Sequence, residues 1–342
     1  MKAGKSMHKS CVVVPNWNGA DSLPSCLDSL LGQSFKPHII VIDNGSVDES
    51  LKLLEQYPQV EVIKHAENKG FAGGVNAGIR LAIKMKATYV ALLNNDAVAD
   101  KNWLAELVSY MDNHDRTGIV TSKILDSTGD KLDSTGDYYT IWGLPYPRGR
   151  NESNIDKYDS SVEIFGASGG ASLYRLSMLE EIGLFDEDFF AYYEDVDISF
   201  RAQLAGHKVS YVPAAVVYHQ IGATSGKLKG FTTYQTMKNL QLLYYKNVPR
   251  RFLFKVGWRL FVAQVLFIAR AFTRRQGWTA VRGDLEGTYL LIKKIKERSR
   301  IQKARKVSDD YVWKLIVHDL PPNARALRKL RTNLGKLVGK NV

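Results

Sequence analysis

Short apolar runs alternate with helical patterns over the first hundred residues of this chain. Four runs rich in β-branched residues predict strands, and the second and fourth are almost wholly apolar, as expected for strands covered on both faces. These runs are 11–14, 39–42, 60–63 and 89–93. The segments between them predict helices, by apolar spacing or by a capping-box sequence. These segments are 23–31, the stretch following Ser46 to Glu49, 77–85 and 103–111. The alternation predicts an α/β fold with a Rossmann-like, doubly wound and mostly parallel sheet.

The middle of the chain, 126–161, is rich in Gly, Asp, Ser, Pro and Tyr and shows no sustained period. We interpret it as loops and short hairpins, with regular structure resuming at Val162. The capping-box spacing of Ser177 and Glu180 then predicts a short helix, and 194–205 predicts a longer one that ends before Gly206. Strands are expected at 209–212 and 214–218.

From about residue 230 onward, long helical patterns carry Lys and Arg among aromatic and aliphatic residues. The most apolar stretch, 252–272, nevertheless contains Lys255, Arg259 and Arg270. A cation near the centre of a spanning helix costs about 2.5 to 3.5 kcal/mol. We therefore interpret this stretch as a helix in a membrane interface, in preference to a buried soluble helix or a membrane span.

Composition is that of a globular protein, with 342 residues, 45% hydrophobic and 24% charged. The net charge of +12 suits nucleic acid, an anionic lipid surface or a phosphorylated substrate. The two cysteines, Cys11 and Cys26, make a disulfide framework improbable and agree with a reducing cytoplasm. The basic N-terminus precedes an apolar run too short for a signal peptide, so we expect no secretion signal.

Polar residues gather where the predicted strands end. They form the stretches 15–19, 43–46 and 94–96, together with a glycine-rich segment at 68–76. Ligands of open parallel sheets bind outside the carboxyl ends of the strands, and glycines let backbone amides approach a phosphate. Each stretch alone can be a turn or a helix cap, and the glycines lack the GxGxxG or P-loop spacing. Their assembly at one rim favours a ligand site.

A second cluster, 189–197, places four aromatic residues directly before three carboxylates. Carboxylates at a helix N-terminus can simply be favourable partners of the helix dipole. A ring platform beside a carboxylate is also the way in which a sugar is held against a general base.

With these motifs the chain resembles an inverting family 2 glycosyltransferase of the GT-A fold, in particular its bacterial rhamnosyltransferase and galactofuranosyltransferase-like branch. The matching stretches lie between Val12 and Ser225. They are VVVPNWNG, VIDNGSVDES, ENKGFAGGVNAGI, ALLNNDA, GASGGASLYR, FFAYYEDVDISFRAQLAG and VVYHQIGATS.

The resemblance implies a donor site for a nucleotide-diphosphate sugar. In it Asp43 would accept a hydrogen bond from the base, while Asn94 would lie near the ribose. The full set of implied donor residues is Pro15, Asn16, Asp43, Gly73, Gly74, Asn76, Asn94 and Asn95. The family's Asp-x-Asp metal motif falls at 94–96, so Asp96 would bind Mg²⁺ or Mn²⁺ with His219 completing the site. Asn94 replaces the first carboxylate of the motif, which predicts weaker metal binding and favours dTDP-rhamnose over a UDP-sugar as donor.

The resemblance further implies that Asp195 is the catalytic base and that five residues line the acceptor side. These are Gly169, Gly170, Tyr192, Tyr193 and Glu194. We expect a catalytic domain at 1–229, with a donor half to about residue 125 and an acceptor half from 126. A basic amphipathic helical region, 230–342, is expected to hold the enzyme on the anionic inner face of the cell membrane.

The acceptor would then be a glycan, most simply one linked to a polyprenyl diphosphate, in cell-surface polysaccharide synthesis. Two other classes of protein fit parts of the sequence. A sugar nucleotidyltransferase would need a Gly-rich signature with Arg and Lys near the first strand, which 16–19 does not provide. A nucleic-acid-binding module lacks a docking motif, and the carboxylates at the rim would repel phosphates, so no nucleic-acid partner is expected.

Overall fold

The computed structural model of the chain describes residues 10–153, 155–220, 228–322, 324 and 328. The first half of the chain contributes β1 (Ser10–Asn16), β2 (His38–Asp43), β3 (Glu61–Lys64), β4 (Tyr89–Leu93), β5 (Ala97–Ala99) and β6 (Thr117–Asp126). The remaining strands are β7 (Leu132–Ser134), β8 (Asp137–Tyr139), β9 (Pro145–Pro147), β10 (Val162–Glu163), β11 (Ala171–Arg175) and β12 (Lys208–His219). Short 3-10 turns are η1 (Ile155–Tyr158), η2 (Glu187–Phe189) and η4 (Arg250–Phe252).

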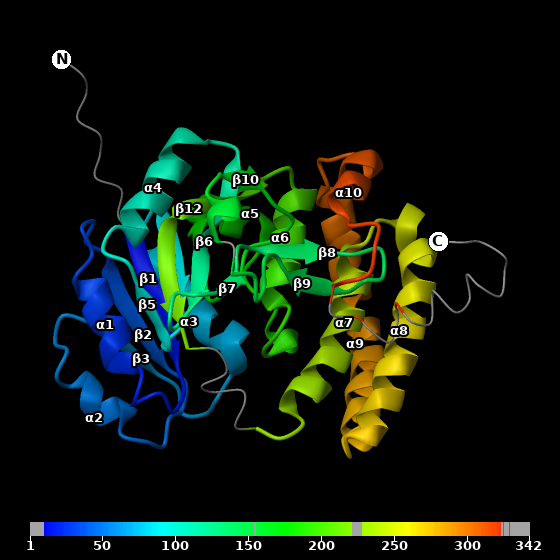
Figure 1. The fold of residues 1–342 in the computed structure, drawn as a ribbon, viewed down its shortest axis with the longest axis horizontal. Coiled ribbons are helices and arrows are strands. Elements are labelled where there is room, and N and C mark those ends of the chain that lie inside the picture. The colour runs from blue at the N-terminus through cyan, green and yellow to red at the C-terminus, as the bar shows by residue number, and fades with distance from the viewer. Residues whose placement is uncertain (1–9, 154, 221–227, 323, 325–327, 329–342) are drawn as a thin grey trace.

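The main sheet has the order β10-β12-β6-β11-β4-β1-β2-β3, with β5 and β7 paired at β12 and β6. Strands β4, β1, β2 and β3 are parallel neighbours, and β11 lies antiparallel between β4 and β6. Strands β8 and β9 form a separate two-stranded sheet. The predicted α/β fold with a mostly parallel sheet is confirmed (Figure 1).

Both faces of the sheet are covered, because side chains of one strand alternate between two cores. In β1, Val12 and Val14 belong to one core, while Cys11 and Val13 belong to the other. The first core is covered by α1 (Leu23–Leu31), α2 (Ser50–Leu54) and α4 (Trp103–Asn113). The second is covered by α3 (Gly70–Lys84), α5 (Leu176–Ile182) and α6 (Glu194–Leu204).

Neither predicted capping box exists in the structure. Helix α2 begins at Ser50 with Glu49 at its N-cap, and the hydroxyl of Ser46 instead accepts a hydrogen bond from the backbone N–H of Asn18. Ser177 lies inside α5, whose N-cap is Arg175. Both serines stand at the right spacing, but the Ser46 side chain binds a neighbouring turn and the chain enters α5 directly from β11.

The structure differs from two other local predictions. The glycine-rich segment is not a loop before a helix, since α3 already begins at Gly70 and contains Gly73 and Gly74. The two strands expected at 209–212 and 214–218 are the single strand β12, with a register shift against β6 between Val212 and Val216. A β-bulge of this kind bends a strand without ending it.

The helical part of the chain consists of α7 (Phe231–Asn247), α8 (Leu253–Thr273), α9 (Gly277–Ala304) and α10 (Asp309–Leu315). It packs against the sheet half (Figure 1), because one hydrophobic cluster joins Val196 and Phe200 of α6 with Leu242 of α7 and Leu290 of α9. The boundary predicted at 229 therefore divides two parts that share a core.

Among the described residues, one helix is long and apolar enough to cross a membrane by length and composition alone. It covers Arg250–Thr273, with a mean hydropathy of 1.7 and 28% of its most apolar window buried.

Candidate functional site

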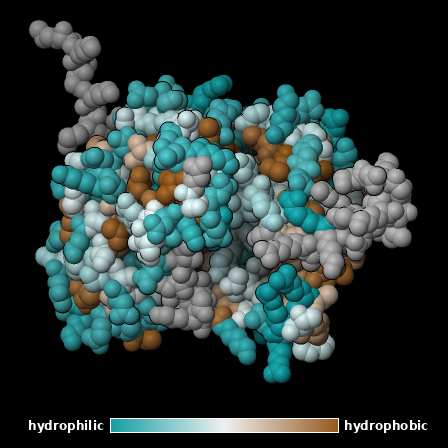
Figure 2. Space-filling view, viewed as in Figure 1, coloured by the Kyte–Doolittle hydropathy of each residue, from teal (hydrophilic) through white to brown (hydrophobic). Residues whose placement is uncertain are grey.

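A cavity of about 990 Å³ lies beyond the carboxyl ends of β1 and β4. The face of the molecule seen in Figure 2 is mostly hydrophilic, with a recess between the sheet half and the helical half. Most of the residues predicted from the sequence line the cavity. They are Pro15, Asn16, Asn94, Asn95, Asp96, Gly169, Gly170, Tyr192, Tyr193, Glu194, Asp195 and His219.

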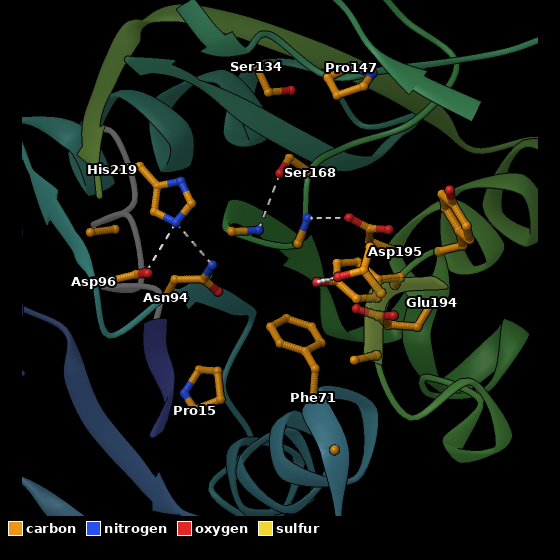
Figure 3. A pocket seen from close by; sticks show the side chains of 18 of the residues that line it. Pro15, Phe71, Asn94, Asp96, Ser134, Pro147, Ser168, Glu194, Asp195 and His219 are labelled. Atoms are coloured by element: carbon orange, nitrogen blue, oxygen red, sulfur yellow. Dashed lines mark hydrogen bonds and ion pairs between the residues drawn. The ribbon is translucent and has the colours of Figure 1, made fainter. Parts of the chain in front are cut away.

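His219, the last residue of β12, joins two acidic residues at one end of the cavity. Its Nε2 lies 3.0 Å from Oδ1 of Asp96 and 3.5 Å from Nδ2 of Asn94, and its Nδ1 lies 2.9 Å from Oδ2 of Asp133 (Figure 3). Arg150 in turn binds Asp133 at 2.7 Å. Burial disfavours the charged ring, but hydrogen bonds to Asp133 and Asp96 raise the pKa of His219 to about 9.

These groups fit a small divalent cation only in part. Within the described ranges no group of three or more His, Cys, Asp or Glu residues is arranged to hold a metal ion. Asp96 and His219 offer one carboxylate oxygen and one imidazole nitrogen 3.0 Å apart at the cavity wall, and this nitrogen becomes a ligand once the ring releases the proton that its raised pKa retains. Mg²⁺ is commonly bound by one or two carboxylates plus substrate phosphates, so the pair fits a cation that a diphosphate completes.

The amides at the strand ends tie three strands together. Asn95 donates to Oδ1 of Asn16 at 2.7 Å, and Asn16 donates to Oδ1 of Asp43 at 3.3 Å. Gly19 leaves room for this contact, since a Cβ there would come within 2.0 Å of the Asn95 amide. Asn95 thus fixes the rim of β1 and β4, whereas Asn94 faces His219.

Four residues of the predicted donor site do not line the cavity. They are Asp43, Gly73, Gly74 and Asn76. The Asn76 amide donates to the Phe185 carbonyl and the Glu187 carboxylate, both at 2.9 Å, and accepts from the N–H of Phe185 at 3.0 Å. Asn76 therefore anchors α3 to the loop before η2. Gly70 lines the cavity in its place, with φ +72° and no room for a Cβ beside the Phe190 carbonyl.

Asp195 lies at the other end of the cavity, in the first turn of α6 (Figure 3). Its carboxylate accepts hydrogen bonds of 2.8 Å from the N–H groups of Gly169 and Val196. Burial raises the pKa of Asp195 above its usual range, although these N–H groups oppose the shift. Burial and the charge of Asp195 raise the pKa of Glu194 well above its usual range, and its Oε2 has no hydrogen-bond partner among the described residues.

The aromatic segment before Asp195 is held in a strained conformation. Phe190, Tyr192 and Tyr193 all have φ between +63° and +71°, which is costly for residues with a side chain. The buried amide of Asn239 on α7 lies 2.9, 2.8 and 2.8 Å from the carbonyls of Phe189, Ala191 and Tyr192. Helix α7 thereby fixes the segment from which Asp195 follows.

Sequence reasoning missed the part of the cavity wall that comes from α7 and the middle segment. Tyr192 and Thr232 join their hydroxyls at 3.1 Å, and the ring of Phe231 lies 6.0 Å from those of Phe190 and Tyr192. The missed lining residues include Asp133, Asp137, Tyr146, Arg150, Leu228, Phe231, Thr232 and Thr236. No motif marks them. The tyrosine-rich composition of the middle segment was a signal for the residues between 133 and 150, and none pointed to those at 228–236.

Comparison with known proteins agrees with this architecture. The model of the family "Glycosyl transferase family 2" matches residues 11–183, just over half of the chain. The chain therefore belongs to glycosyl transferase family 2. The matched region includes every predicted donor residue and Asp96, and it ends before Asp195.

Three curated relatives are glycosyltransferases by name. The low-salt glycan biosynthesis hexosyltransferase Agl10 of Haloferax volcanii is 25% identical over 56% of this chain and 61% of its own length. The O-antigen chain rhamnosyltransferase RfbN of Salmonella typhimurium is 26% identical over 62% and 66%. The N-acetylglucosaminyl-diphospho-decaprenol L-rhamnosyltransferase of Mycobacterium tuberculosis is 26% identical over 63% and 77%. The chain thus spans less than two thirds of the first two relatives.

Solved structures share the fold. A mannosyltransferase from Pyrobaculum calidifontis, in complex with GDP-Man and Mn²⁺, has a TM-score of 0.52 at 16% identity, covering 90% of this chain and 88% of that one. S. aureus TarS has a TM-score of 0.52 at 17% identity, covering 90% and 91%. Since both matches extend over nine tenths of this chain, the likeness of fold includes helices beyond the sheet half.

Proposed function

We propose that this chain is an inverting glycosyltransferase that moves a sugar from a nucleotide-diphosphate sugar to a hydroxyl group of a glycan acceptor. The observation that carries the proposal is the placement of Asp195 across one cavity from Asp96 and His219. A base and a diphosphate-binding pair on opposite sides are what a single in-line displacement at a sugar carbon requires.

The chemistry follows from these positions. The acceptor oxygen attacks the anomeric carbon from the Asp195 side, and the carboxylate takes the hydroxyl proton as the new bond forms. The bond from the anomeric carbon to the diphosphate breaks on the opposite side, which inverts the configuration. A divalent cation, Mg²⁺ or Mn²⁺, held by Asp96, His219 and the donor would offset the charge on the departing diphosphate.

The donor we favour is dTDP-rhamnose, with a UDP-sugar as the alternative. Asn94 gives the cation site an amide in place of a carboxylate, as in the deoxysugar-using branch that the sequence resembles. Two of the relatives are named rhamnosyltransferases, and one of these is named for a diphospho-decaprenol acceptor. We therefore propose a lipid-linked glycan acceptor in cell-envelope polysaccharide synthesis.

Membrane association belongs to the same proposal. The exposed apolar side chains of α8 and α9 and the cations between them suit the anionic inner face of a cell membrane, where the acceptor lipid would be reached. The protein would then work in the cytoplasm as a peripheral enzyme.

Transfer assays with a panel of nucleotide sugars and a synthetic N-acetylglucosaminyl-diphospho lipid test the proposal. Asp195→Asn is expected to lower the transfer rate by about 10² to 10⁴-fold, because the base is lost. The exposed Asp21→Asn serves as the matched control and keeps its rate. In a cation titration, Asp96→Ala is expected to require more Mg²⁺ or Mn²⁺ than the native protein. Full activity of Asp195→Asn would exclude Asp195 as the base.

A further inference from the structure

Asp137 is a second carboxyl group in the cavity that the mechanism above does not use. It begins β8 and lies opposite Pro147 of β9. Its backbone N–H and carbonyl pair with Gly166 at 2.7 and 3.1 Å, so its position is fixed from two sides. Pro147, its partner across the hairpin, lies on the side of the cavity opposite Phe71 (Figure 3).

Asp137 is only 8% exposed as a residue, yet it lines the cavity. Within the described part of the chain its carboxyl group makes no hydrogen bond and no ion pair. Asp133, four residues earlier, is bound by both His219 and Arg150. Neither oxygen of this carboxyl group is among the fully buried atoms without a partner, so the group opens to the cavity, where a polar group of a ligand can bind it.

The surroundings of Asp137 favour the neutral carboxyl group more strongly than those of Asp195. Burial and the negative charge of Asp195 raise the pKa of Asp137 well above its usual range, although the charge of Arg150 opposes the shift. Asp195, which receives two backbone N–H groups, carries the negative charge more readily. Two carboxyl groups whose surroundings push their pKa values apart can act as a neutral hydrogen-bonding acid and an anionic base.

We propose that Asp137 binds a second hydroxyl group of the acceptor sugar, adjacent to the hydroxyl that Asp195 deprotonates. This inference rests on the proposed function and adds to it the acceptor class, a sugar ring with neighbouring hydroxyl groups. Tyr146, Tyr192 and Tyr193 also line the cavity, and aromatic rings pack against the C–H faces of sugars. A carboxyl group accepts hydrogen bonds from hydroxyl groups and, when protonated, also donates one, which matches the hydroxyl groups of a sugar.

Two reactions of the same enzyme distinguish an effect on the acceptor site from an effect on the donor site. Without an acceptor, water attacks the donor, so hydrolysis of the nucleotide sugar reports the donor site and Asp195. Asp137→Ala is expected to lower kcat/KM for the N-acetylglucosaminyl-diphospho lipid by roughly 10 to 100-fold and to lower hydrolysis much less, so that the ratio of transfer to hydrolysis falls. Asp137→Asn, whose amide still donates and accepts, is expected to recover part of that loss. The exposed Asp156→Ala is the matched control.

A melting experiment distinguishes a binding role from a structural one. Since the carboxyl group has no partner, Asp137→Asn and Asp137→Ala are expected to raise the melting temperature or leave it unchanged. A lower melting temperature together with equal losses in hydrolysis and transfer would show a structural role instead. Native transfer rates in both variants would overturn this inference alone. Native protein that neither hydrolyses nor transfers any sugar of the panel would overturn the proposed function, and this inference with it.

Discussion

Asp195 combines burial with two backbone hydrogen-bond donors, and the balance predicts the pH dependence of transfer. Since burial raises its pKa, activity should fall as the pH decreases, with an inflection above the usual aspartate value of about 3.9. The measurement is kcat/KM for the acceptor between pH 4 and pH 8. Folding stability should change in the opposite direction. The contribution of Asp195 to the free energy of unfolding should fall as the pH rises, because the raised pKa makes the ionised group costly in the folded state.

Chemical unfolding of Asp195→Asn checks this sign. The variant should be more stable than the native protein at neutral pH. The difference should shrink as the pH falls through the raised pKa of the folded state and vanish below the unfolded value of about 3.9, where the native carboxyl group is neutral in both states. A transfer rate that stays flat down to pH 4, or a variant that is less stable at neutral pH, would contradict the assignment.

The polar residues at the strand ends were predictable because strands of a parallel sheet end at one edge. Asn94 and Asp96 could therefore be placed at one edge from the strand pattern, whereas Asp195, at the start of α6, was assigned to the same site by the family resemblance. Asn76 and Asp137 could not. The contacts of Asn76 with Phe185 and Glu187 join residues 109 and 111 positions apart, and Asp137 enters the cavity through a hairpin in a segment without periodicity.

Helices α6, α7 and α9 are joined by a buried network of charges. Lys246 on α7 is fully buried and lies 2.5, 3.0 and 3.0 Å from carboxylates of Asp186, Asp197 and Glu297. Burial raises the pKa of Asp186, but the ammonium groups of Lys246 and Lys294 hold it well below its usual range. Asp197 lies two residues after Asp195 on α6, so the network fixes the helix that carries the proposed base.

Removing one charge from this network should be severely destabilising. Lys246→Met removes the cation shared by Asp186 and Asp197, so among the described residues each keeps a single cationic partner, Lys294 or Arg201. The substitution is expected to lower the free energy of unfolding by about 3 to 5 kcal/mol, as measured by urea denaturation. The control is Arg251→Ala. It removes an exposed ion pair in which the guanidinium of Arg251 lies 3.6 Å from the carboxylate of Asp310, and it should lower the free energy of unfolding by about 0 to 1 kcal/mol. Equal effects of the two substitutions would show that the network contributes little.

The sequence predicted most elements of the fold but not their junctions. The strands β1 to β4 and the helices α1, α4 and α6 follow from apolar spacing. The start of α3 was missed because glycines usually interrupt helices, whereas Gly70, Gly73 and Gly74 all lie in its first turns. At Gly74 the helix packs closely on the rim, since a Cβ there would lie 3.4 Å from the amide of Asn44. No local pattern could show that Lys246 and Asn239 contact the segment around Asp195, since both look like polar residues of a surface helix.

The helical half carries most of the apolar surface that the described residues expose. On α8 the exposed residues Phe254, Phe261, Val265 and Phe272 recur every seven or four positions and so share one face. On α9, Trp278 lies 5.8 Å from Phe272, so the apolar stripes of the two helices meet at the turn between them. Further exposed apolar residues on the two helices are Trp258, Leu285, Tyr289, Ile292 and Ile295.

Combined with the net charge of +12, this surface predicts binding to anionic membranes. Phe254, Phe261 and Trp278 are 83%, 67% and 79% exposed, and burying such side chains in a lipid interface is worth up to about 1.5 to 3 kcal/mol each. The triple substitution to Ser should therefore lower the partition onto phosphatidylglycerol vesicles by at least about 100-fold in sedimentation assays. Val47→Ser, at a 91% exposed site on the sheet half, is the control and should bind like the native protein.

The dependence on salt and on protein concentration distinguishes membrane binding from the alternative use of this surface, self-association with a second copy of the chain. Attraction of exposed cations to anionic lipid is screened by salt, so vesicle binding should weaken from 0.05 to about 0.5 M NaCl, and neutral vesicles should bind less. The triple variant should keep its transfer rate with a short-chain acceptor, because the substituted residues lie outside the cavity lining. A native protein that forms dimers through this surface in ultracentrifugation, and leaves anionic vesicles unbound at low salt, would assign the surface to self-association instead.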